Sequence, residues 1–229
     1  MSQDKITIIV PVLNEEGLLP DSLRQFKLTS YEELIVVDGG STDNTVSIAR
    51  EFTDKVFVAK TGRASVMNFG AQQSTGKILL FLHADCVLPE KGFQMIRETL
   101  RDRSIAAGGF FLSIDHPKAG FRIIESAANL RARSTSLIYG DQGMFLRKSV
   151  FDHIGGFADM PLMEDIEISG RLKKQGNIVF VQPPVKVSPR RWLREGIIFT
   201  TIRDWTIAFS YKFLGISPDR LIKYYKDIR

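Results

Sequence analysis

Polar clusters follow three apolar runs in the N-terminal part of the chain. Asn14-Glu15 comes after a run that ends at Pro11-Val12-Leu13, Asp38-Gly39 follows Leu34 to Val37, and His83 and Asp85 follow Ile78 to Leu82. In an open α/β sheet the carboxyl ends of the strands form the ligand crevice, so acids placed there repeatedly predict one shared site. Each acid alone could equally be a turn residue or a helix cap.

His83 and Asp85 are spaced to act together. Two residues apart at a strand end, they lie on the same side of the chain and can both face the crevice. Hard cations prefer oxygen ligands, so the pair suits Mn²⁺ or Mg²⁺ held mainly by Asp85 and by ligand phosphates. His83 could instead bond to a ribose or phosphate, or cap the turn.

Two further pairs could do chemistry. A carboxylate such as Asp38 can accept the imide N–H of uracil, and a guanidinium such as Arg63 can donate to a carbonyl or phosphate oxygen. Arg63 could also be a solvated cation. Glu164-Asp165 opens a predicted helix, where an acid can cap the helix and can also serve as a general base.

Two motifs in the second half could contact a further substrate. Asp141 and Gln142 stand between glycines, so this polar bend could bind hydroxyl groups or be a plain turn. Arg190-Arg191-Trp192 could bring two cations to a diphosphate and an aromatic face to a sugar ring.

The elements that would position these residues alternate. Short apolar runs with polar ends predict buried parallel strands, and helical spacing fills the gaps. We expect strands over 6–12, 34–37, 55–59 and 78–82, and helices over 18–28, 45–52, 64–73 and 92–100. This alternation predicts an α/β fold with a mostly parallel, doubly wound sheet.

The second half breaks the alternation. We expect strands over 106–114, 144–147 and 178–181, and helices over 121–133 and 165–175. From Leu193 a stripe of large apolar residues recurs every three or four positions and predicts one long amphipathic helix. The stripe consists of Ile198, Ile202, Trp205, Phe209 and Phe213.

These motifs together resemble family 2 glycosyltransferases, enzymes of the GT-A fold that move a sugar from a nucleotide diphosphate to an acceptor. The resemblance rests on Pro11 to Glu15, Val37 to Thr45, Gly62-Arg63-Ala64, His83-Ala84-Asp85 and Glu164-Asp165. His83 stands at the first position of the family's Asp-x-Asp motif, and Leu13 where an aromatic residue is common.

The resemblance implies a three-layer αβα sandwich and a set of roles. The nucleotide site would comprise Pro11, Leu13, Asn14, Glu15, Asp38, Gly39, Arg63, Asn68 and Asp85. Asp85 and His83 would hold the Mn²⁺ or Mg²⁺, Asp165 would be the base with Glu164 beside it, and Asp141, Gln142, Arg191 and Trp192 would bind the acceptor.

The implied activity is inverting transfer from a nucleotide-sugar donor, with a UDP-sugar expected, to an unknown acceptor hydroxyl. Inversion is expected because no second carboxylate is identified as a nucleophile. The alternatives are an inactive nucleotide- or glycan-binding relative and a nucleotidyltransferase. We expect residues 1–192 to form one catalytic domain, with a nucleotide half to about 105 and an acceptor half from about 106, and 193–229 to form a helical extension.

Charge and cysteine content constrain the partners. Residues 188–229 carry nine Lys/Arg and four Asp/Glu, whereas residues 1–187 carry 22 of each sign. A nucleic-acid surface would need a basic face on the main body, so none is expected. One cysteine and no basic-then-apolar leader predict a cytoplasmic protein. The C-terminal stripe could lie on the inner membrane face, or pack on the main domain or a second subunit of a homodimer.

Overall fold

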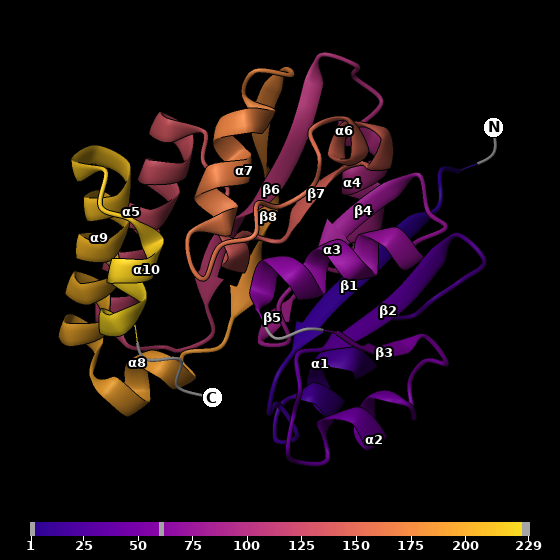
Figure 1. Cartoon of the computed structure of the whole chain (residues 1–229), viewed down its shortest axis with the longest axis horizontal. Helices are drawn as coiled ribbons and strands as arrows, with labels where there is room; N and C mark the ends of the chain where they lie inside the picture. The colour runs from indigo at the N-terminus through magenta and orange to yellow at the C-terminus, as the bar shows by residue number, and fades with distance from the viewer. Residues whose placement is uncertain (1–2, 60–61, 226–229) are drawn as a thin grey trace.

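The computed structural model describes residues 3–59 and 62–225 (Figure 1). Within them the strands form an eight-stranded sheet in the order β3-β2-β1-β4-β7-β6-β8-β5. β7 and β5 run opposite to the other strands, which confirms the predicted mostly parallel sheet. The strands are β1 (Ile6–Val12), β2 (Glu32–Asp38), β3 (Val56–Val58), β4 (Ile78–Phe81), β5 (Cys86–Val87), β6 (Ile105–Ile114), β7 (Met144–Arg147) and β8 (Asn177–Val187).

Helices cover both faces of the sheet. They are α1 (Leu19–Arg24), α2 (Thr45–Ala49), α3 (Arg63–Gln73), α4 (Gly92–Thr99), α5 (Ala119–Thr135), α6 (Lys148–His153), α7 (Glu164–Leu172), α8 (Arg190–Glu195), α9 (Ile197–Leu214) and α10 (Pro218–Leu221), with single turns η1 (Gly140–Gln142) and η2 (Ile222–Tyr224). One buried apolar cluster joins the sheet to α1, α2, α4 and α5. A second joins its other face to α3, α6 and α7, so the fold has three layers.

The first four parallel strands end at one edge of the sheet. Val12 at the end of β1 pairs with Asp38 at the end of β2, and Gly39 N donates to Val12 O at 2.9 Å. β4 ends beside Ile9, where Leu82 N donates to Ile9 O. The segments after β1, β2 and β4 therefore meet, as the apolar runs with polar ends predict.

α3 lies unusually close to β1 because of Gly70. A Cβ at this position would come within 2.6 Å of Ile9 Cγ2, shorter than real side chains tolerate. The glycine thus lets the helix approach the sheet. This approach fixes the N-terminus of α3, where Arg63 begins the helix.

One predicted strand needs a new end, and two short elements were not predicted. The last strand runs to Val187 rather than Val181, because β8 continues through Pro183-Pro184 beside β6 with a register shift. The two-residue strand β5 and the helix α6 were not predicted. Both are too short to produce a periodic pattern.

The predicted single helix from Leu193 is two helices. Gly196 adopts φ 97°, which lies outside the helical region, so α8 ends there and α9 begins after it. Figure 1 shows α9 at one flank of the molecule, away from the β1–β2–β3 side of the sheet. In the part of the chain that the structure describes, helices fall short of the length and hydropathy that crossing a bilayer requires.

Candidate active site

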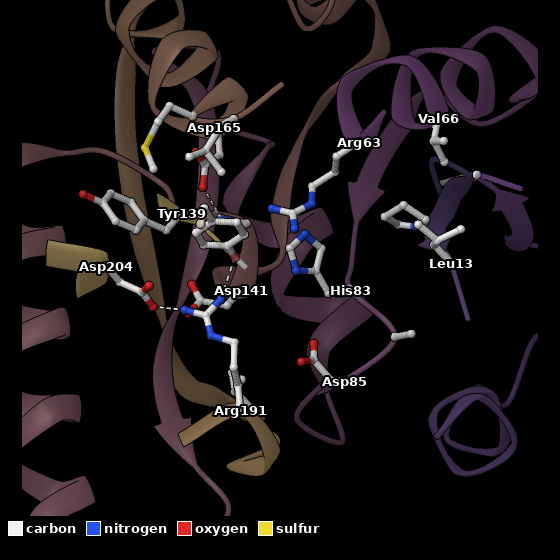
Figure 2. Close-up of a pocket in the computed structure, with 18 of the residues that line it drawn as sticks. Leu13, Arg63, Val66, His83, Asp85, Tyr139, Asp141, Asp165, Arg191 and Asp204 are labelled. Carbon is white, nitrogen blue, oxygen red and sulfur yellow. Dashed lines mark hydrogen bonds and ion pairs between the residues drawn. The ribbon is translucent and has the colours of Figure 1, made fainter. Parts of the chain in front are cut away.

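A cavity of about 350 Å³ opens where the segments after β1, β2 and β4 meet. Figure 2 shows Leu13 and Val66 on one side, Asp165, Tyr139 and Asp204 on the other, and His83 and Arg63 between them. The predicted site residues that line it are Pro11, Leu13, Glu15, Gly39, Arg63, His83, Asp85, Asp141, Asp165, Arg191 and Trp192. The predicted residues Asn14, Asp38, Asn68, Gln142 and Glu164 lie outside this lining.

Asp38 lies behind the cavity wall and organises the turn after β2. The residue is 1% exposed, and its Oδ2 accepts hydrogen bonds from Gly40 N at 2.8 Å and Ser41 N at 2.9 Å. Its Oδ1 accepts from the Ser41 hydroxyl. Asp38 therefore shapes the loop whose Gly39 lines the cavity.

Asn14 and Asn68 serve neighbouring loops. Asn14, at φ 52°, accepts from Thr42 N at 2.9 Å and its own N donates to Ser41 Oγ, so the loops after β1 and β2 are joined. Asn68 on α3 makes two hydrogen bonds with the backbone of Phe157, at 2.8 and 2.9 Å. Both residues thus support the site from behind its surface.

Glu15 and Arg190 connect the two ends of the site. The Arg190 guanidinium donates to both Glu15 carboxylate oxygens at 2.6 Å, although the residues are 175 positions apart. The Glu15 carboxylate is nearly buried, and Arg190 Nη2 also lies 3.8 Å from Asp85 Oδ2. A two-pronged arginine–carboxylate contact fixes the guanidinium plane, so a cation is held beside Asp85.

Asp165, Gly140 and His83 are packed together across the cavity. Gly140 N donates to Asp165 Oδ2 at 2.7 Å. A Cβ at Gly140 would come within 2.7 Å of the His83 ring and 3.7 Å of Asp165 Oδ2. The bare α-carbon of Gly140 thus lets the imidazole and the carboxylate approach each other from β4 and α7.

Glu164 is buried next to Asp165 and faces Arg63. Arg63 Nη1 lies 3.6 Å from Glu164 Oε1, and the Glu164 side chain is 3% exposed. Burial raises the pKa of Glu164; Arg63 opposes the rise and Asp165 adds to it. Glu164 therefore orients Arg63 toward the cavity.

Asp141 is an acid in a site that disfavours its charge. Its Oδ1 is shielded from solvent and has no hydrogen-bond partner among the described residues. Burial raises the pKa of Asp141 to about 6, with Asp165 and Asp85 adding to the rise and Arg131 and Arg191 opposing it. A buried acceptor without a donor is costly, so this group is available to a substrate hydroxyl.

Gln142 turns away from the cavity. It is fully buried, and its Oε1 accepts from Tyr139 N at 3.0 Å and from Arg131 at 3.3 Å. The Arg131 guanidinium lies over the Tyr139 ring, 3.1 Å from its centroid. Gln142 thus holds the bend that presents Asp141.

Cys86 lies beside that bend. Burial, together with the charges of Asp85 and Asp141, raises the pKa of the Cys86 thiol well above its usual range, so this thiol stays unreactive.

Helices α8 and α9 close one side of the cavity. Arg191 and Trp192 of α8 were predicted from the sequence, whereas the contribution of α9 was missed. Arg191 forms an ion pair with Asp204 of α9 and donates to the Tyr225 hydroxyl at 2.6 Å. Trp192 Nε1 donates to Thr201 Oγ1 at 3.2 Å. Asp204 is the one acid in the sequence of α9, and this was the available signal that one side of the helix faces the cavity.

A divalent metal would need phosphate or water oxygens as well as protein groups to complete its coordination in this site. The described residues contain no group of three or more His, Cys, Asp or Glu able to hold a metal ion. Asp85 and His83 both line the cavity. A hard cation that keeps phosphate and water ligands needs few protein groups, so these two side chains fit a metal completed by a diphosphate.

Comparison with known proteins places this chain among glycosyltransferases. It is 26% identical over 168 residues to Glycosyltransferase AglE of Haloferax volcanii, covering 66% of this chain and 55% of that protein. It is 24% identical over 208 residues to the Probable glycosyltransferase YdaM of Bacillus subtilis, covering 75% of this chain and 47% of that protein. The chain thus spans about half the length of these curated relatives.

A solved structure supports the fold. The Mannosyltransferase PcManGT from Pyrobaculum calidifontis superposes with a TM-score of 0.64 at 22% identity, over 82% of this chain and 57% of that one. This likeness confirms the expected GT-A fold. The model of Glycosyl transferase family 2 matches residues 7–158, well over half of the chain. The chain therefore belongs to glycosyl transferase family 2.

Proposed function

We propose that this protein transfers a sugar from a nucleotide-diphosphate donor to an acceptor hydroxyl. The observation that carries the proposal is the grouping of Asp165, His83 and Asp85 around one cavity at the strand ends. A base, a phosphate-facing pair and an acceptor-facing acid, Asp141, are the groups that this transfer requires. AglE is named as a glycosyltransferase and YdaM as a probable one, which supports the same reaction class.

The donor side is assigned to the wall formed by Leu13, Gly39, Val66 and Arg63. Leu13 and Val66 would contact the base, and the Arg63 guanidinium would donate to the base or the diphosphate. A UDP-sugar is the proposed donor, and Asp38 would act by holding the Gly39 loop. PcManGT was solved with GDP-Man and Mn²⁺, so a guanine donor belongs in the same screen.

The reaction is proposed to be a single displacement with inversion. Asp165 would take the acceptor hydroxyl proton, a role worth roughly 10²–10⁴-fold in rate. Glu164 would keep Arg63 in place, and Asp141, Arg191 and Trp192 would bind the acceptor. Gly140 N donates to Asp165 Oδ2 and Ile166 N donates to Oδ1 at 2.8 Å, so both oxygens are held in place. Each carboxylate oxygen can accept more than one hydrogen bond, which leaves capacity for the reacting hydroxyl.

Charge on the departing diphosphate needs a cation. Asp85 and His83 would hold Mn²⁺ or Mg²⁺, and the metal would neutralise the leaving group as a Lewis acid. Arg190, fixed by Glu15, adds a second positive group next to Asp85. The chain therefore supplies both the metal ligands and a permanent cation.

A donor screen tests the proposal. Purified protein is heated with UDP-, GDP- and ADP-sugars, each with and without Mn²⁺, and the unfolding midpoint is measured. A bound donor raises apparent stability by mass action, and the matching nucleotide sugar should also be slowly hydrolysed. The proposal fails if every nucleotide sugar leaves both the midpoint and the free diphosphate unchanged.

A further inference from the structure

The outward side of α9 is a wide apolar surface. Six large side chains on it are between 51% and 75% exposed: Ile198, Phe199, Ile202, Trp205, Phe209 and Phe213. We call these six the outer face of α9. The Phe209 and Phe213 rings contact each other at a tilt of 34°, with centroids 4.9 Å apart, and Figure 1 shows the helix at the flank of the molecule.

The inward side of α9 is anchored by four buried residues, of which only Ile207 is large. Thr200, Ile207, Ala208 and Ser210 are buried, and Ala208 packs against Leu137 and Ile166. The expectation that the apolar stripe packs on the main domain is therefore wrong.

The exposed charges of the C-terminal helices are mainly positive. The exposed charged residues described from α8 to η2 are Arg194, Lys212, Asp219, Arg220 and Lys223. The acids Asp204 and Glu195 are withdrawn into ion pairs with Arg191 and Arg203. A second copy docked on the same face would bring like charges together, whereas an anionic lipid surface attracts them.

We propose that the outer face of α9 docks into the interface of an anionic bilayer. Helices with an aromatic and aliphatic face and basic flanks lie in this interface with the apolar side chains among the upper acyl chains. Membrane docking is a property separate from the proposed transfer reaction. Only the inference that docking orients the cavity toward an acceptor rests on that reaction.

Docking would set the orientation of the cavity. Asp204, Ile207 and Ala208 on the inner side of α9 line the cavity. A helix with its side chains is about 10–12 Å across, so the cavity would lie within one helix diameter of the lipid headgroups. The acceptor side, around Arg191 and Asp141, would then open toward molecules held at the membrane surface.

Vesicle sedimentation tests the surface. The probes are phosphatidylcholine vesicles and vesicles of phosphatidylcholine with phosphatidylglycerol, each at low and physiological salt. We expect wild-type protein to sediment with the anionic vesicles and to be partly released by salt. The double variant Ile202→Gln/Phe209→Gln should lower this partitioning by roughly tenfold or more.

A matched variant controls for loss of exposed apolar area. Tyr31 and Val58 are also exposed, at 42% and 61%, and lie on the β2–β3 side of the sheet. Tyr31→Gln/Val58→Gln should sediment like wild type. Wild-type protein in the supernatant with anionic vesicles at low salt, or equal sedimentation of both double variants, overturns the proposal.

Two further readouts separate the other outcomes. The chain has two tryptophans, so Trp192→Phe leaves Trp205 as the sole one, and lipids brominated near the headgroup should quench it. Unquenched Trp205 fluorescence, or a dimer by sedimentation velocity that Ile202→Gln/Phe209→Gln dissociates, overturns lipid docking. Donor-induced thermal shifts without vesicles test the transfer reaction separately, because the outer face lies away from the donor wall.

Discussion

The backbone N–H of Gly140 donates to Oδ2 of Asp165 at 2.7 Å, which ties the proposed base to the bend after α5. The same glycine packs against the ring of His83, since an added Cβ would lie only 2.7 Å from it. Asp165, the proposed base, and His83, a proposed metal ligand, are thus separated by one residue that has no side chain. The distance between His83 and Asp165 therefore depends on Gly140 having no side chain.

Gly140→Ala should therefore impair catalysis more than folding. The new methyl group would displace the His83 ring or Asp165, and misplacement of about 1 Å can cost ~10²-fold in rate. Turnover and urea unfolding are measured together, with Gly170→Ala on α7 as control because its added Cβ meets nothing within 4 Å. Equal turnover in the two variants would show that this spacing does not matter.

Asp85→Ala should remove metal-stimulated activity more completely than His83→Ala. A carboxylate is the better ligand for a hard cation, and Asp85 lies at the cavity wall. Turnover is titrated with Mn²⁺ and Mg²⁺ after chelation. A wild-type enzyme indifferent to chelator would instead assign neutralisation of the diphosphate to Arg190, which lies 3.8 Å from Asp85.

Asp141→Asn should stabilise the fold at pH 8 while lowering turnover. Burial raises the pKa of Asp141 from 3.8 to about 6, and Asp165 and Asp85 add to this rise. The folded state thus holds a proton that the unfolded state has lost, so wild-type stability falls as pH rises from about 4 to 6.

The gain in the Asn variant should reach about 1–3 kcal/mol above pH 7 and shrink toward pH 4, because the amide carries no charge to desolvate. Urea unfolding across this pH range measures the difference. A gain that does not change with pH would mean that Asp141 does not titrate in this range.

Glu33 should make the fold sensitive to acid. Burial alone would raise its pKa, but hydrogen bonds from Lys55, Thr7 and Thr75 outweigh it and lower the pKa from 4.5 to about 2. Its stabilising contribution is complete above about pH 5 and is lost as pH falls through 2. Glu33→Gln should cost about 2–3 kcal/mol at pH 7 and much less near pH 2; unfolding curves that differ equally at both pH values would exclude this linkage.

The first half of the fold could be predicted because its strands are buried on both faces. Continuous apolar runs such as Ile6–Val12 then end abruptly in polar residues, which also locates the site. The direction of each polar side chain could not be predicted. Asp38 and Gln142 turn into their own bends because nearby backbone N–H groups offer them hydrogen bonds.

Long-range ion pairs and the buried side of α9 also could not be predicted from the sequence. Glu15 and Arg190 form their ion pair although they are 175 positions apart in the sequence. No local sequence pattern encodes that contact. The period of α9 revealed an amphipathic helix but not which side is buried. The expected burial of the apolar side fails there, since Thr200, Ala208 and Ser210 face inward with Ile207, whereas the six residues of the outer face are exposed.

The central claim is that Asp165 takes the proton from the acceptor hydroxyl, and Asp165→Asn tests it most directly. Once the donor screen has identified a nucleotide sugar, transfer rate and donor affinity are measured for this variant, with the exposed Asp152→Asn as control. We predict nearly unchanged donor affinity and a turnover lowered by ~10²-fold or more, because the amide keeps the shape of the carboxylate and cannot accept the proton. A folded Asp165→Asn protein that turns over within a few-fold of wild type would contradict the account.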